Sequence, residues 1–150
     1  MKEIKIDYYQ KFRNSCLDTS AVGLSVGSEF SYYSATPENA RVIAWADILG
    51  IHFCRKEDSE VIYVVDPEAP KNKAVHPVAA NFQDFMGLIV ACRHASLLWK
   101  VHSLSRRECE DMIASEKPTM KQRSVLRAIG NIYHPPVIAD PYGYMKNLRK

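Results

Sequence analysis

Hydrophobic residues are densest between positions 60 and 101, and their spacing changes within this stretch. The run Val61-Ile-Tyr-Val-Val65 consists of β-branched and aromatic residues, which favour a strand. Asp66-Pro67 ends this strand, because proline has no N–H to donate to a neighbouring strand. After a polar turn at 68–73, a second extended run covers 74–79. The pattern therefore predicts two strands in close succession.

A helix is predicted directly after the second strand. Asn81 is a favourable N-cap residue, and Asp84 places a carboxylate near the free N–H groups of the first turn. The apolar segment that begins at Phe82 predicts that this helix is long.

Two more helices are expected in the last third of the chain. Ser105-Arg-Arg-Glu108 and Thr119-Met-Lys-Gln122 both have the form of a capping box. The first helix is expected to reach about Ser115, before Pro118, and the second to end near Gly130. The segment 140–144, with its Asp-Pro and glycine, is predicted to be a turn.

The first half of the chain predicts further strands. Residues 42–43 and 51–53 are expected to be strands on either side of a bend near 47–50, and the charged residues 55–59 are expected to form a hairpin turn. Residues 1–22 favour a helix, and 23–40 favour short strands or a loop. Because strands come first and helices gather later, we expect an α+β fold. Its central, mainly antiparallel sheet would have flanking helices concentrated in the C-terminal half.

Length and charge suggest how the chain is organised. A chain of 150 residues is expected to form a single domain, with 116–150 as a helical, basic C-terminal extension. Residues 1–99 carry a net charge of −2, whereas 100–150 carry +5. No apolar run reaches the roughly 20 residues of a membrane helix. Since the N-terminus is charged where a signal peptide is apolar, we expect a soluble, cytoplasmic protein.

Metal and cofactor chemistry has only weak support in the sequence. Cys16, Cys54, Cys92 and Cys109 are scattered along the chain, which is typical of buried reduced thiols. His52 and Cys54 would share one side of a strand, and a histidine at 76 on a neighbouring strand could complete a zinc site. This spacing is not distinctive, so we expect no metal and no cofactor.

Catalytic signatures are also weak. The sequence contains no Gly-x-Ser-x-Gly elbow, and its paired acidic residues are typical of a solvated turn and a solvated helix. We therefore expect a protein that is not an enzyme. The alternative is a dispersed catalytic site, for which His52 and His76 are the candidate residues.

Two surfaces are candidates for binding. Tyr32, Tyr33 and Trp45 lie near predicted loops, where exposed aromatic side chains would suit a protein interface. In the basic third of the chain, Lys121, Arg123 and Arg127 could neutralise phosphates of a nucleic acid. No nucleic-acid-binding signature accompanies these cations, so a solvated helix face is the favoured interpretation of them.

Four segments within residues 45–112 form a recognisable pattern: Gly50-Ile-His-Phe53, Val61-Ile-Tyr-Val-Val-Asp66, Val75-His-Pro-Val-Ala79 and Asn81-Phe-Gln-Asp-Phe85. On these segments, residues 45–112 resemble the SUKH superfamily. The superfamily includes fungal regulators of cell-wall glucan synthesis and bacterial proteins associated with toxin immunity. The resemblance implies an α+β fold without catalytic residues. It also implies a non-enzymatic module that binds a protein partner such as a toxin.

Overall fold

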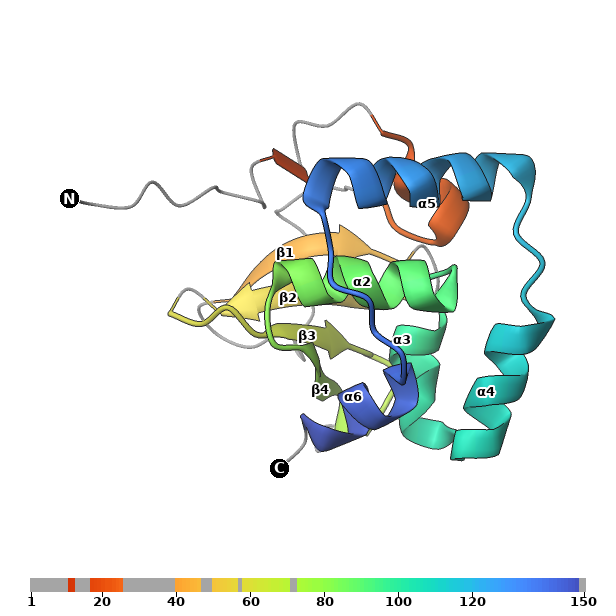
Figure 1. Ribbon diagram of the computed structural model, residues 1–150. Coiled ribbons are helices and arrows are strands. Elements are labelled where there is room, and N and C mark those ends of the chain that lie inside the picture. The colour runs from red at the N-terminus through yellow and green to blue at the C-terminus, as the bar shows by residue number, and fades with distance from the viewer. Residues whose placement is uncertain are drawn as a thin grey trace.

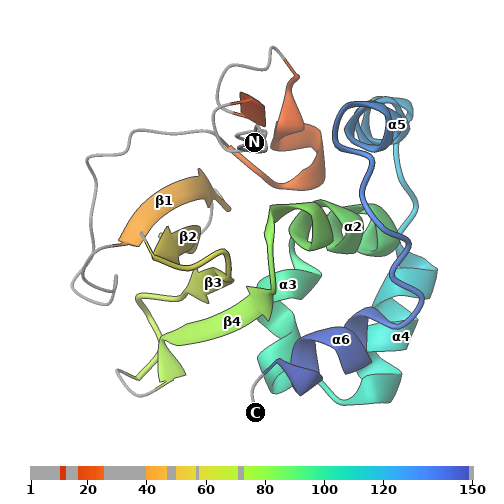
Figure 2. The same cartoon turned by 60° about the vertical axis from the view of Figure 1, so that its left-hand side comes forward.

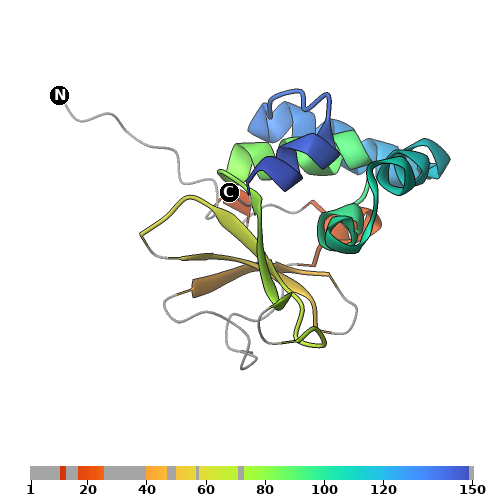
Figure 3. The same cartoon turned by 90° about the horizontal axis from the view of Figure 1, so that it is seen from below.

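The computed structural model describes residues 11–12, 17–25, 40–46, 50–56, 58–70 and 73–148. The predicted α+β architecture is confirmed: strands come first, and helices occupy most of the C-terminal half. Figure 3 shows two layers, with the sheet on one side and the helices stacked above it.

In the part of the chain that the structure describes, the sheet is an antiparallel meander. Its order is β1 (Ala40–Trp45), β2 (His52–Lys56), β3 (Ile62–Val65) and β4 (Val75–Ala79). Phe53, Val64 and His76 are cross-strand partners and therefore share the face that bears the helices. The next row, which contains His52 and Val65, belongs to the opposite face.

Helix α2 (Phe82–Cys92) covers the sheet and forms the centre of the core (Figure 1). It begins as predicted, since the Asn81 side chain accepts a 2.8 Å hydrogen bond from the Asp84 N–H. The Phe85 ring lies 5.0 Å from the Phe53 ring, measured between centroids, and both side chains are fully buried. Burial of a side chain of this size typically contributes about 1.5–3 kcal/mol.

Helix α2 is shorter than the apolar pattern predicts. Arg93 adopts the left-handed conformation (φ 67°) and ends the helix. The Ala95 N–H then donates to the Val22 carbonyl at 2.8 Å, a tertiary bond that a continuous helix could not make. The chain resumes with α3 (Leu97–Lys100) and η3 (Val101–Ser103).

Helices α4 (Arg106–Ser115) and α5 (Met120–Tyr133) both begin at the predicted capping boxes. Helix α4 ends where predicted, whereas α5 extends three residues past Gly130 because Tyr133 is buried against the core. Helix α5 packs on α2 and on η1 (Thr19–Val22). Among the described residues, every helix is too short or too polar to cross a membrane.

The predicted turn over 140–144 is wrong, because these residues begin helix α6 (Pro141–Asn147). The Asp140 side chain caps the helix by accepting from the Gly143 N–H at 3.1 Å, and Pro141 occupies the first turn. Met145 is fully buried and holds the helix on the core.

The predictions for the N-terminal region fall largely outside the described residues. Within them, η1 is a 3-10 turn that ends at Gly23, whose positive φ of 83° suits glycine. Ser25 forms an isolated antiparallel bridge with Trp45 at the end of β1. The bend expected near 47–50 is described only at Gly50, which also has a positive φ.

Candidate functional site

Of the three aromatic residues nominated for partner binding, the structure describes only Trp45. Its indole is half-buried and lies 4.7 Å from the His52 ring, measured between centroids. Its backbone exchanges two hydrogen bonds with Ser25. Trp45 therefore packs as part of the sheet, while Tyr32 and Tyr33 lie outside the described residues.

The three nominated cations of α5 do not form a single patch. Lys121 Nζ lies 2.6 Å from Asp18 Oδ2, and this contact is the main reason that the pKa of Asp18 falls to about 2. Arg123 and Arg127 are exposed, and no carboxylate of the described residues pairs with them. Lys121 is thus engaged with η1, which leaves the two arginines available on α5.

The histidines considered for metal binding or catalysis are separated by the sheet. His52 is fully buried, and its Nδ1 donates to the Gly50 carbonyl at 2.9 Å. Burial lowers the pKa of His52. His76 lies on the other face and stacks on His102, with ring centroids 3.9 Å apart. Within the described residues, no group of three or more His, Cys, Asp or Glu side chains could hold a metal.

The thiols are poor nucleophiles where they lie. Cys54, Cys92 and Cys109 are buried and unbridged. Burial is the main cause that raises the pKa of Cys54 and of Cys92 to about 12. Since the thiolate is the reactive form, these groups are unreactive near neutral pH. Cys16 lies outside the described residues.

The structure contains a groove that the sequence did not reveal. It has a volume of about 700 Å³ and lies between α2, α4, the C-terminal half of α5 and the segment 135–140. Figure 2 shows α4, α6 and the segment between α5 and α6 arranged around α2. We call this cavity the α2–α4 groove. Its apolar lining includes Val90, Ala91, Ile113, Ala114, Val137 and Ile138.

The segment 134–140 forms one wall because α5 stops sharply and the chain then stays extended. His134 adopts the left-handed conformation, and two prolines follow it. The segment passes closely over Gly87 of α2, where an added Cβ would lie 2.6 Å from the Pro136 carbonyl oxygen. Gly87 is therefore required by the approach of this wall.

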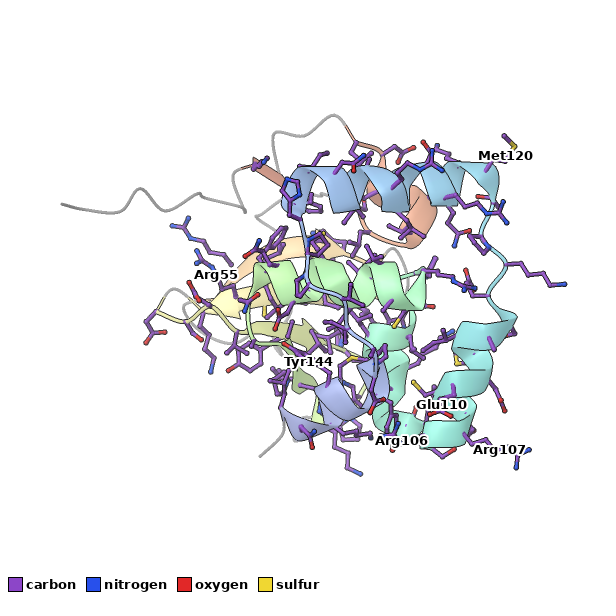
Figure 4. The ribbon with its side chains drawn as sticks, viewed as in Figure 1. Arg55, Arg106, Arg107, Glu110, Met120 and Tyr144 are labelled. Carbon is purple, nitrogen blue, oxygen red and sulfur yellow. The ribbon has the colours of Figure 1, made fainter. Side chains whose placement is uncertain are left out.

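One end of the groove is closed by an ion-pair cluster. Arg106, in the first turn of α4, donates to both carboxylate oxygens of Asp140 at 2.9 and 3.1 Å. Glu110 lies 3.4 Å from the same guanidinium. The hydrogen bond from Arg106 is the main cause that lowers the pKa of Asp140. Figure 4 shows Arg106 and Glu110 together on α4. We call these three residues the acidic end.

A second polar contact holds α6 against α2. The Tyr144 hydroxyl donates to Asp84 Oδ2 at 2.6 Å and accepts from the Ala80 N–H at 2.9 Å. Burial first, and then the bond to Asp84, raise the pKa of Tyr144 to about 12. The wall formed by 135–140 is therefore anchored at its C-terminal end by two independent contacts.

Two features of the groove have no explanation within the described chain. Val137, on its rim, is 96% exposed. Gly130 lies inside α5 and borders the groove, yet a Cβ added there would meet no atom within 4 Å. A glycine inside a helix costs about 1 kcal/mol relative to alanine. Unlike Gly87, Gly130 leaves open space at the edge of the groove.

The arrangement as a whole is suited to binding. Its walls are apolar, its ends carry charge, and the groups nominated for catalysis lie elsewhere. In the sequence, the only indication was the apolar pair Val137-Ile138 within a proline-rich connection.

No protein-family model, curated protein or solved structure matches the chain. The resemblance of residues 45–112 to the SUKH superfamily stays a prediction. The function is therefore inferred from the groove and the residues that line it.

Proposed function

We propose that this chain is a non-enzymatic protein-binding module that holds a segment of a partner protein in the α2–α4 groove. The observation that carries the proposal is a preformed apolar groove with an almost fully exposed valine, Val137, on its rim. Concave apolar surfaces of this size are typical of binding sites. A contiguous apolar surface that stays exposed typically marks an interaction site, and Val137 continues the apolar lining of the groove onto its rim.

The anchoring of the groove supports the same function. Arg106 and Asp140 connect two of its walls, and Tyr144 connects α6 to α2. A groove that is already ordered loses little conformational entropy when a ligand enters, so more of the contact energy remains as affinity. The partner would supply apolar side chains that cover Val90, Ile113 and Val137.

The SUKH-like segments point to the same class of partner. The resemblance implies binding to a protein such as a toxin, and it covers β2, β3, β4, α2 and most of α4. In this proposal α2 and α4 supply the floor and one wall of the groove. The remaining wall comes from 135–140, outside the resemblance.

A second candidate function is nucleic-acid association through α5. It is favoured by the exposure of Arg123 and Arg127 on a helix that contains no acidic residue. Such binding would depend steeply on salt concentration. The engagement of Lys121 with Asp18 leaves this surface with fewer free cations than the sequence suggests.

Co-purification from the source organism tests both candidates. We would compare the tagged wild type with Val137→Asp and with a control on the outer side of α4, Arg107→Asp. Both substituted residues are exposed, so both variants should fold, which circular dichroism would check. We expect one stoichiometric protein with the wild type and with Arg107→Asp, and loss of that protein with Val137→Asp.

Two outcomes would contradict the first candidate. Equal retention of the protein by all three forms would exclude the groove as its site. Recovery of nucleic acid without protein, abolished by raised salt, would favour the second candidate instead.

A further inference from the structure

The two ends of the α2–α4 groove differ in charge. The acidic end contains one cation and two carboxylates, and a second cation, Lys146, lies beside it with its Nζ 5.3 Å from the centroid of the Tyr142 ring. Asp140 takes both strong bonds from Arg106, whereas Glu110 has only the 3.4 Å contact and its side chain is 60% exposed. Glu110 is therefore the carboxylate that can still pair with a cation of a ligand.

The opposite end of the groove contains an arginine, Arg93. Arg93 Nη1 donates to the backbone carbonyl of Glu116 at 3.1 Å, which does not neutralise its charge. The Glu116 side chain instead accepts from Gln122 Nε2 at 2.8 Å. Among the described residues, no carboxylate forms an ion pair with Arg93.

Two more arginines lie on the side of α5 that carries Gly130. At about 100° per residue, Arg123 lies about 20° and Arg127 about 60° around the helix from Gly130, which borders the groove. The Gln122 side chain also donates to the Arg93 carbonyl at 3.1 Å and so fixes the start of α5 beside Arg93. We call Arg93, Arg123 and Arg127 the cationic rim.

From this charge distribution we propose that the groove selects its ligand by the order in which acidic and basic residues occur along it. The ligand is an apolar segment of a partner protein with acidic residues at the end that meets the cationic rim. Its other end carries a basic residue that meets Glu110. The inference rests on the proposed function and adds the chemistry and the direction of the bound segment.

Physical complementarity supports each part of this ligand. Apolar side chains in its middle match Val90, Ile113 and Val137. The open space at Gly130 allows the backbone of the segment to approach α5 closely. Opposite charges at the two ends favour one direction of binding and disfavour the reverse, in which like charges would meet.

Selection from a displayed library of random peptides tests the proposal without knowledge of the partner. The full-length wild type is the target, and Val137→Asp is used to remove peptides that bind elsewhere. We expect the enriched peptides to be apolar in the middle, acidic at one end and basic at the other.

Synthetic peptides then test the direction in which the ligand lies in the groove. One enriched peptide would be compared with a version in which the charged ends are exchanged, by fluorescence anisotropy at low and at moderate salt. We expect the exchanged peptide to bind the wild type at least roughly tenfold more weakly, since several pairs change from attraction to repulsion. The double variant Arg93→Glu/Arg123→Glu should abolish this preference, because Glu110 is unchanged and both ends of the groove then attract the basic end of the peptide. The control Arg107→Glu should leave the preference unchanged.

The outcomes separate this inference from the proposed function. Equal affinity for both peptides would overturn the charge order but would leave the groove as a protein-binding site. Failure to enrich any peptide that depends on Val137 would overturn the inference as well. If the Val137→Asp variant also retains the co-purified protein, then the proposed site itself is wrong.

Discussion

The two sides of α2 bury their apolar residues to different degrees. Toward the sheet, Phe85, Leu88 and Ile89 are completely inaccessible to solvent. Toward the groove, Val90 and Ala91 are only half-buried, although they belong to the same helix. The first side is covered by the chain itself, and the second is partly left open. One helix therefore serves stability on one side and, in our proposal, recognition on the other.

The contacts that hold the two regions also differ. The sheet side is held by aromatic and aliphatic packing, for example between Phe53 and Phe85. The groove is framed by polar contacts, among them the exposed ion pair between Arg106 and Asp140. Exposed ion pairs contribute little to stability. Substitutions in the two regions should therefore separate folding from binding.

The largest expected effect is on the sheet side. Phe85→Ala removes a fully buried ring that contacts Phe53 and Phe82. The lost burial and the resulting cavity should lower the free energy of unfolding by about 3–5 kcal/mol. Denaturant unfolding, monitored by tryptophan fluorescence, would measure the change. A loss below about 1 kcal/mol would contradict the assignment of this residue to the central core.

The two glycines that border the groove should respond in opposite ways. Gly130→Ala adds a methyl group where no atom lies within 4 Å, so it should stabilise α5 by about 1 kcal/mol. Gly87→Ala would place its methyl group 2.6 Å from the Pro136 carbonyl oxygen, so it should destabilise by about 1–3 kcal/mol. Thermal unfolding of both variants checks the signs.

Measurements of partner binding give a second comparison of these two glycines. Because Gly130→Ala narrows the edge of the groove, it should lower the affinity for the partner protein while it raises the free energy of unfolding. If this variant bound as well as the wild type, the open space at Gly130 would have no role in recognition.

The smallest expected effect concerns the acidic end and its dependence on pH. Arg106 lowers the pKa of Asp140 in the folded state below its ordinary value of 3.8. This contribution to stability is present above the unfolded pKa and is lost as the pH falls through the folded pKa. Arg106→Ala should therefore flatten the decline of stability below about pH 4. Unfolding curves between acidic and neutral pH, with Arg107→Ala as control, would detect the change, and identical acid profiles would contradict it.

Local signals in the sequence predicted much of the fold. The strand before Asp66-Pro67, the N-cap at Asn81 and the two capping boxes all depend on residues that are close together in the chain. Helix α6 was misread because Asp140-Pro141 is equally typical of a turn and of a helix start. The burial of Met145, which favours the helix, is a tertiary effect.

The groove could not be predicted in the same way. Its walls come from three regions of the chain that are brought together only by folding. The end of α2 at Arg93 depends on the tertiary bond between Ala95 and Val22, and neither glycine nor proline marks it in the sequence. The difference between Gly87 and Gly130 likewise depends on which atoms surround them in space.

The most direct test of the central claim is site-specific photo-crosslinking in the source organism. A photoreactive amino acid would replace Val137 on the rim of the groove and, in a control, Arg107 on the outer side of α4 (Figure 4). We predict one crosslinked partner protein from position 137, which Arg93→Glu/Arg123→Glu reduces, and none from position 107. If position 137 captured no protein, or only the proteins that position 107 captures, the α2–α4 groove would not be the binding site.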